Sequence, residues 1–209
     1  MSKMHCLFTC LLSLVASLSG TQAAATGWPE DVRMNLKVCW ATPDFLEEKQ
    51  WVMDVVAREY GRRGLLRILA WGDCEAMPDA NLRITIADQM SHTKGVGAAL
   101  DQVDHGMVLN FTFKQWSRGC KTKLRDCIEG ISVHEFGHVM GLADTVVPDT
   151  KGTVTCEGIL IAEHAQSGAV ASTAFDSVMN YCNPEWRSGR LAVSDVELLS
   201  RLVSTPCDQ

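Results

Sequence analysis

The sequence predicts an α+β fold in which helices pack on a twisted mixed sheet of about five strands. Short apolar segments rich in β-branched residues recur between turn residues in the first half of the chain, as in a sheet. Longer segments place apolar residues every three to four positions, as in amphipathic helices. With 209 residues, the chain is long enough for one domain and too short for two of ordinary size.

The N-terminal segment has the pattern of a signal peptide. Lys3 precedes an apolar run over residues 7–18, and the small residues Ala23–Ala25 follow it. The run is shorter than the roughly 20 residues that a membrane-spanning helix needs. We therefore expect residues 1–25 to be removed on export. Residues 26–209 would then form one secreted, monomeric domain without stable insertion in a membrane.

The strands and the first helix are expected in the N-terminal half. The predicted strands are residues 36–40, 66–71, 82–87, 95–100 and 108–113, of which the Gly-spaced segment 95–100 is the weakest. After the first strand, an apolar stripe runs from Pro43 to about Arg62 and predicts a long helix, which Gly61 and Gly64 end.

Two more helices are expected in the C-terminal half. One runs from Asp126, which has the capping-box spacing with Glu129, to Gly141, a suitable C-terminal stop. The last begins at Ser194, which has the same capping-box spacing with Glu197.

The charge and cysteine content restrict the class of protein. The formal net charge is −6, which argues against nucleic acid as a partner. The densest basic stretch, Lys114 to Arg125, is expected to be a solvated loop and helix entry. In an oxidising compartment the cysteines are expected to form disulfides, with Cys120–Cys127 as a local pair and at least one cysteine left over. The cysteines beyond the signal peptide are Cys39, Cys74, Cys120, Cys127, Cys156, Cys182 and Cys207.

One segment carries the chemistry of a metal site. His134 and His138 are four residues apart, so one face of a helix presents both imidazoles to a single ion. Glu135 flanks that face, where a general base is needed. Gly141 permits a sharp chain reversal, which brings Asp144 back as a third ligand. Two histidines and one carboxylate are a normal ligand set for catalytic zinc.

These residues resemble the metzincin metallopeptidases, whose motif HExxHxxGxx is followed by a third ligand and, further on, by a methionine-containing turn. Because the third ligand here is Asp144, the chain is most similar to the Asp-ligand variants, of the snapalysin or matrixin-like type. Residues 177–181 (SVMNY) are similar to the Met-turn. The resemblance implies a zincin fold, with Met179 as an apolar base beneath the metal. It also implies that Tyr181 reaches the zinc or the oxyanion, a role for which simple packing is the alternative.

A different assignment of the third ligand also fits the histidine motif. Another class of HExxH enzymes takes a glutamate from a following helix, for which Glu157 and Glu163 are the candidates, and His164 is a further possible ligand. We favour Asp144, because the metzincin arrangement accounts for both Gly141 and Met179. The arrangement with a glutamate from a following helix needs neither residue.

The sequence thus predicts a secreted zinc-dependent endopeptidase with one catalytic Zn²⁺ ion and protein or peptide substrates. Peptide bonds would be hydrolysed by a metal-activated water, with Glu135 as the general base. We expect the substrate to lie extended against the strand at 95–100. A secreted module that binds zinc without catalysis is the alternative, and the intact Glu135 argues against it.

Overall fold

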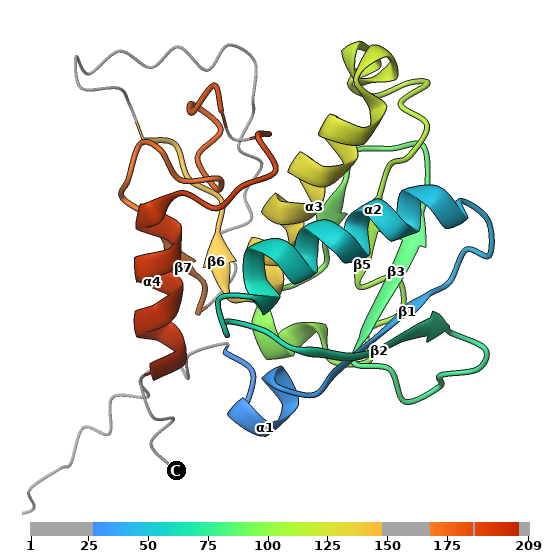
Figure 1. The fold of residues 1–209 in the computed structure, drawn as a ribbon, viewed down its shortest axis with the longest axis horizontal. Coiled ribbons are helices and arrows are strands. Elements are labelled where there is room, and N and C mark those ends of the chain that lie inside the picture. Colours follow the sequence, from blue (N-terminus) through green and yellow to red (C-terminus); the bar gives the residue numbers. More distant parts are fainter. Residues whose placement is uncertain (1–26, 148–167, 186, 205–209) are drawn as a thin grey trace, which may run out of the picture.

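The computed structural model describes residues 27–147, 168–185 and 187–204 (Figure 1). Its main sheet has five strands in the order β2-β1-β3-β5-β4. Four of these strands run parallel, and β4 pairs antiparallel with β5 at the sheet edge. The strands are β1 (Leu36–Trp40), β2 (Ile68–Asp73), β3 (Leu82–Ile86), β4 (His92–Thr93) and β5 (Met107–Leu109). The predicted mixed sheet is therefore confirmed.

The principal helices pack on this sheet and on each other. Helices α2 and α3 are in contact, and both lie in front of the sheet in the view of Figure 1. The helical segments are α1 (Glu30–Arg33), α2 (Leu46–Val56), the π-helical turn η1 (Ala57–Gly61), the 3₁₀ turns η2 (Gly97–Leu100) and η3 (Arg118–Thr122), α3 (Leu124–Val139) and α4 (Val193–Ser204). The long helix predicted after the first strand corresponds to α2 with η1.

A buried aromatic cluster fixes α3 against α2 and the sheet. The ring of Phe136 on α3 lies 6.2 Å from the ring of Tyr60 and 6.2 Å from that of Trp71 on β2. The hydroxyl of Tyr60 donates a hydrogen bond of 2.6 Å to the carbonyl oxygen of Val133. Burial of one such aromatic side chain contributes about 2–3 kcal/mol. The helix that carries the histidine motif is thus held on its apolar side.

The strand expected at 95–100 is not formed. Backbone N–H groups in this stretch bond to carbonyls three residues back, as from Ala99 to Val96 and from Asp101 to Ala98. These local bonds make the 3₁₀ turn η2 and leave no ladder for a neighbouring strand. The edge strand is instead β4, so residues 95–100 offer no strand edge for the expected docking of an extended substrate.

The strand expected at 108–113 is shorter than predicted. Strand β5 ends at Leu109, and the side-chain oxygen of Asn110 accepts hydrogen bonds from the backbone N–H groups of Thr112 and Phe113. This Asx-type turn competes with the ladder and directs the chain away from the sheet.

Neither predicted capping box is formed. Helix α3 begins at Leu124 without a side-chain cap, and Glu129 binds Arg125 and Arg58 instead of a backbone N–H. Helix α4 begins at Val193, and the hydroxyl of Ser194 donates to Asp176. Both helix starts fall within two residues of the predicted positions.

A second, two-stranded parallel sheet follows α3. It pairs β6 (Leu142–Ala143) with β7 (Val170–Ala171). Past residue 144, an isolated parallel bridge pairs Thr145 with Asn180.

Two disulfides join described cysteines, Cys39 to Cys74 and Cys120 to Cys127. The second confirms the predicted local pair. Cys182 is also disulfide-bonded, whereas Cys156 and Cys207 lie outside the described residues. None of the helices in the described part of the chain is long and apolar enough to span a bilayer.

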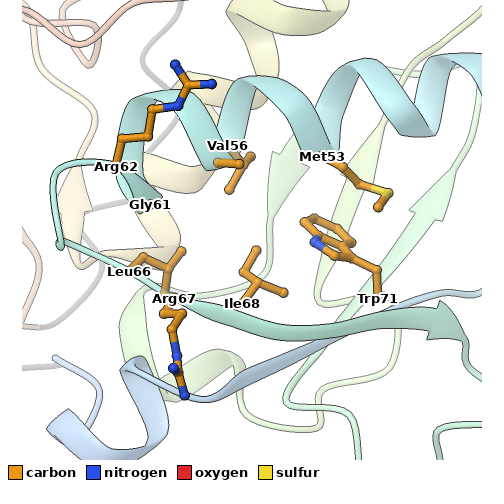
Figure 2. Close-up of a pocket in the computed structure, with 9 residues that line it drawn as sticks. Met53, Val56, Gly61, Arg62, Leu66, Arg67, Ile68 and Trp71 are labelled. Atoms are coloured by element: carbon orange, nitrogen blue, oxygen red, sulfur yellow. The ribbon is translucent and has the colours of Figure 1, made fainter.

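A pocket of about 350 Å³ opens between α2, η1 and β2 (Figure 2). Val56, Leu66, Ile68 and Trp71 make it largely apolar, and Arg62 stands at its end. It contains none of the residues that the sequence marks as functional.

Candidate metal centre

Helix α3 presents the two histidines from one buried face. His134 and His138 are 2% and 6% exposed, and their ring centroids are 5.0 Å apart. Their spacing of one helical turn brings the imidazoles to the same side of the helix, as the sequence predicts.

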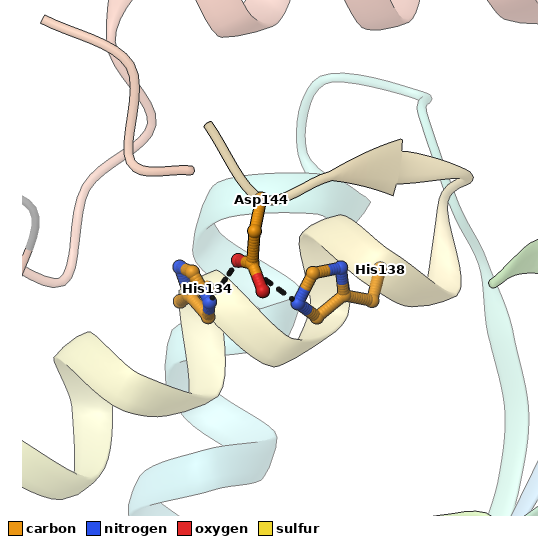
Figure 3. Close-up of side chains that lie close together, drawn as sticks. All are labelled: His134, His138 and Asp144. Atoms are coloured by element: carbon orange, nitrogen blue, oxygen red, sulfur yellow. Dashed lines mark ion pairs between the residues drawn. The ribbon is translucent and has the colours of Figure 1, made fainter. Parts of the chain in front are cut away.

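The chain reversal after α3 brings Asp144 to these imidazoles. Gly141 has a φ of +95°, a backbone conformation that side-chain-bearing residues rarely adopt. Strand β6 then returns along the helix, and Asp144 Oδ1 lies 3.1 Å from Nε2 of His134 and 3.4 Å from Nε2 of His138 (Figure 3). One ligand atom from each of the three residues lies within 4.8 Å of the others. The structure therefore brings together the three residues that the sequence nominates.

The hydrogen bonds of the imidazoles decide which nitrogen faces the carboxylate. Nδ1 of His134 lies 2.9 Å from the carbonyl oxygen of Val178, and Nδ1 of His138 lies 2.9 Å from that of Leu142. A carbonyl oxygen only accepts, so each Nδ1 must carry a proton. In the neutral imidazole this leaves the lone pair on Nε2.

The site therefore fits a divalent cation. Two Nε2 lone pairs converge on Asp144 Oδ1, a buried carboxylate oxygen that accepts no hydrogen bond from the described part of the chain. Three electron-pair donors at this separation repel one another unless a proton or a cation lies between them. Imidazoles whose Nδ1–H groups are fixed by backbone carbonyls are the usual ligands of zinc.

The pKa values of the groups in the site show the same demand for positive charge. Burial lowers the pKa of His138, but the carboxylates of Asp144 and Glu135 outweigh it and raise this pKa to about 9. Burial raises the pKa of Asp144, and the two neighbouring imidazoles outweigh it and hold the pKa well below its ordinary range. A metal ion would displace the proton that His138 otherwise retains.

Among the described residues, no hydrogen bond accounts for the burial of the Glu135 Oε2 atom. The Glu135 side chain is 3% exposed, and its Oε2 atom makes no hydrogen bond. Burial raises the pKa of this carboxyl group, against the opposing influence of the two histidines. Buried carboxylates are normally paired, and an unpaired one beside a metal-type cluster is typical of a group that takes part in proton transfer.

Met179 lies directly beneath the helix segment between the two histidines. It is fully buried, and a Cβ atom placed on Gly137 would come within 2.4 Å of its Sδ atom. The close approach requires glycine at position 137. Met179 therefore packs against α3 at Gly137, which lies between the two histidines in the sequence.

Tyr181 belongs to the same group. Its hydroxyl lies 3.3 Å from Nε2 of His134, and the two rings are 5.2 Å apart. Burial raises the pKa of the hydroxyl far above its ordinary value, and the charges of Asp144 and Glu135 add to this effect. The hydroxyl therefore stays protonated and able to donate a hydrogen bond.

Sequence reasoning missed Asp195, which holds the Met-turn in place. This fully buried carboxylate accepts from the hydroxyl of Ser177 at 2.5 Å and from the backbone N–H of Val178 at 3.0 Å. Because Val178 in turn fixes the imidazole of His134, Asp195 acts on the site through the turn. The sequence does carry a signal for Asp195. It lies four positions before the buried Leu199, so a charged residue falls on the apolar face of α4.

The alternative third ligands lie outside the described residues, namely Glu157, Glu163 and His164. Among the described residues, the only group of three or more side chains that could hold a metal ion is that of His134, His138 and Asp144.

Comparison with solved structures identifies the fold. One structure of myroilysin aligns with a TM-score of 0.55 and 13% identity, covering 88% of this chain and 98% of that one. A second structure, a crystal structure of myroilysin, aligns with a TM-score of 0.54 and 12% identity, covering 87% of each chain. A crystal structure of archaemetzincin from Methanopyrus kandleri aligns with a TM-score of only 0.46 and 11% identity, covering 85% of this chain and 99% of that one. No protein-family model matches the sequence, and no curated protein matches it significantly. The predicted zincin-like fold is confirmed.

Proposed function

We propose that this protein is a secreted zinc-dependent endopeptidase of the metzincin type with an aspartate as third ligand. The observation that carries the proposal is the convergence of Nε2 of His134, Nε2 of His138 and a carboxylate oxygen of Asp144 beside the unpaired Glu135. The fold likeness to myroilysin, a metallopeptidase, supports it. The two disulfides between described cysteines and the disulfide-bonded Cys182 are in keeping with export, for which residues 1–25 would serve as the signal peptide.

In the proposed mechanism, His134, His138 and Asp144 hold the ion. When bound, zinc supplies a Lewis acid that polarises the scissile carbonyl and makes water a stronger acid. Glu135 takes a proton from the attacking water while the water oxygen bonds to the carbonyl carbon. As the C–N bond breaks, Glu135 passes that proton to the leaving amine nitrogen. Burial raises the pKa of this carboxyl group, which makes it a stronger proton acceptor.

One further side chain and one strand assist in this proposal. The protonated hydroxyl of Tyr181, on the His134 side of the group, donates to the carbonyl oxygen as negative charge develops there. The short edge strand β4 offers free backbone groups to an extended polypeptide. Asp144 is preferred to Glu157, Glu163 or His164 because its carboxylate already lies at both imidazoles.

The test is expression of the secreted protein, measurement of its zinc content and an assay of casein cleavage with and without a chelator. We expect one zinc per chain and cleavage that the chelator abolishes. Glu135→Ala should keep the zinc and lower kcat by at least about 100-fold. Stoichiometric zinc without cleavage of any protein would favour the non-catalytic binding module, and full activity of Glu135→Ala would refute the mechanism.

A further inference from the structure

The loop before α3, residues 114–123, is a positively charged surface on an acidic protein; we call it the basic loop. All of its residues are exposed except Cys120. Its cationic side chains are Lys114, Arg118, Lys121 and Lys123. None of the four has a hydrogen-bond or ion-pair partner for its side chain among the described residues. By contrast, Lys37 pairs with Asp79 and Arg83 with Asp104.

Two large apolar side chains are exposed in the basic loop and in the segment that Asp88 joins to it. Trp116, within the basic loop, is 52% exposed, and Met90, in a neighbouring loop, is 58% exposed. The loops are joined by Asp88, whose Oδ1 accepts from the backbone N–H of Lys114 at 2.9 Å. Aromatic residues, methionine and arginine are the types enriched in protein–protein interfaces. The surface thus combines positive charge with apolar contact area.

The fold of the basic loop does not depend on its cationic side chains. The Cys120–Cys127 disulfide ties it to α3, and Phe113 anchors its start in the core. The contacts of Asp88 are to backbone N–H groups at 114 and 115 and to the Asn110 side chain. The four charges are therefore available for a partner, and their removal should leave the structure intact.

The basic loop adjoins the candidate metal centre. Helix α3 begins at Leu124, directly after the loop, and His134 is ten residues further along it, which corresponds to about 15 Å of helix. Arg187, which follows the Met-turn, donates to the hydroxyl of Ser117 in the loop at 3.4 Å. An extended polypeptide rises about 3.3 Å per residue, so about five residues span the distance.

We propose that the basic loop is an exosite that binds an acidic segment of polypeptide substrates, about five or more residues from the bond that is cleaved. The inference rests on the proposed peptidase function. The net charge of −6 repels acidic polypeptides from the molecule as a whole, so the basic loop is where their attraction is concentrated. A polypeptide partner is favoured because the loop combines interface-type side chains with a position beside a site for extended chains.

The experiment compares two fluorogenic peptides that share one cleavable segment. One continues into a Glu-rich tail after a spacer of six residues, and the other into a Ser/Gly tail of equal length. The enzymes are the wild type, the basic-loop variant Lys121→Gln/Lys123→Gln and the control Lys37→Gln/Arg62→Gln. The control loses the same charge from positions outside the loop. A third variant, Trp116→Ser, tests the apolar contact.

We expect the acidic tail to lower KM of the wild type and the control without changing kcat, because the contact is uniform between ground and transition states. Loss of two exposed charge pairs should raise KM for the acidic peptide about 2- to 25-fold. KM for the neutral peptide should stay unchanged. The preference should largely disappear at roughly 0.5 M salt. Trp116→Ser should also raise KM for the acidic peptide.

Binding of a fluorescent Glu-rich peptide to the Glu135→Ala form, measured by anisotropy, provides a readout that needs no catalysis. Cleavage of neither peptide by the wild type would contradict the peptidase function, while this binding would still decide whether the loop recognises acidic chains. The basic-loop and control substitutions are added to the Glu135→Ala form for this measurement. Equal binding of the Glu-rich peptide by all three proteins would overturn the exosite proposal. The proposal would also be overturned if the Glu-rich peptide did not bind while phosphatidylglycerol vesicles bound through the same loop. The basic loop would then be a lipid-binding surface.

Discussion

Each imidazole of the candidate site is oriented by one backbone carbonyl, and the two carbonyls have different origins. That of Leu142 lies four residues after His138, just beyond the turn at Gly141. That of Val178 belongs to the Met-turn and acts on His134 from 44 residues away. The first contact follows from local chain geometry, whereas the second depends on how the turn is held.

Replacement of Asp144 should separate ligand charge from ligand position. In Asp144→Asn the oxygen remains but the negative charge is lost, so the site neutralises less of the charge of the ion. We expect zinc affinity, measured by competition with a chromophoric chelator, to fall at least about tenfold. The control Asp104→Asn, at a side chain that is 82% exposed, should bind zinc as the wild type does. Equal affinity of Asp144→Asn and the wild type would remove Asp144 from the ligand set.

The pH dependence of activity should also reflect the charge of Asp144. A carboxylate neutralises more of the zinc charge than an imidazole, so the water at the site is a weaker acid than with three histidines. We expect the acid limb of the kcat/KM profile of Asp144→His to move to lower pH. An unchanged acid limb in a zinc-loaded variant would contradict this reasoning.

The contact between Gly137 and Met179 should be visible as a coupling free energy. In Gly137→Ala the new Cβ would approach the sulfur to 2.4 Å, and overpacking of this kind costs typically about 1–3 kcal/mol. Urea denaturation should show this loss, and Gly137→Ala/Met179→Ala should recover part of it relative to the sum of the single changes. Gly119→Ala, where a Cβ meets nothing within 4 Å, is the control. Strict additivity of the two changes would contradict the contact.

At the level of elements, the side chain of Asn180 joins the Met-turn to the segment that carries Asp144. Its Oδ1 accepts from the backbone N–H of Val147 at 2.9 Å, and its Nδ2 donates to the carbonyl of Val147 at 3.0 Å. The side-chain amide thus pairs with Val147 as a neighbouring strand would. The backbone N–H of Thr145 donates a hydrogen bond of 2.9 Å to the carbonyl oxygen of Met179. Asp144 is therefore fixed between β6 and this pairing.

Asn180→Ala should weaken metal binding through the position of Asp144. We expect zinc affinity to fall about 10- to 100-fold, as for other changes in groups that orient ligands. Asn183→Ala is a matched control, because Asn183 is also buried on this turn but binds Asp176 and Ser177 instead. Thermal denaturation should show a loss of stability in both variants. Only Asn180→Ala should also lose zinc affinity. A parallel loss of affinity in both would indicate general damage to the turn.

The sequence predicts elements best where one periodic pattern governs a segment. The spacing of His134, His138 and Gly141 follows from helix geometry and from the conformational freedom of glycine, and the structure has that arrangement. Side chains that bind backbone groups are harder to foresee. Asn110 shortens β5, and Asp195, the third residue of α4, accepts a hydrogen bond from the backbone N–H of Ala192 just before that helix. Such bonds compete locally with ladders and caps and leave no periodic trace.

At the scale of the whole molecule, two disulfides between described cysteines reinforce a domain whose order of elements is largely evident from the sequence. Cys39–Cys74 links the end of β1 to the segment after β2 across 35 residues, and Cys120–Cys127 spans only seven. The longer loop restricts the unfolded chain more strongly. What the sequence could not provide is the pairing of Cys39, since any of several partners was open to it.

The two disulfides should therefore differ in their contribution to stability. Removal of the first by Cys39→Ser/Cys74→Ser should cost about 4 kcal/mol, and removal of the second by Cys120→Ser/Cys127→Ser about 2 kcal/mol, from chain entropy alone. Urea unfolding of the secreted variants measures both. A larger loss for the shorter bridge would mean that the basic loop depends on its disulfide for more than restriction of the unfolded chain.

The most direct measurement of the central claim is an anomalous difference map, recorded at the zinc absorption edge from crystals of the secreted protein. We predict a single peak bonded to Nε2 of His134, Nε2 of His138 and a carboxylate oxygen of Asp144, at roughly 2.0–2.2 Å from each. A peak held by Glu157, Glu163 or His164 in place of Asp144, or no peak at the two histidines in a zinc-replete protein, would contradict the account.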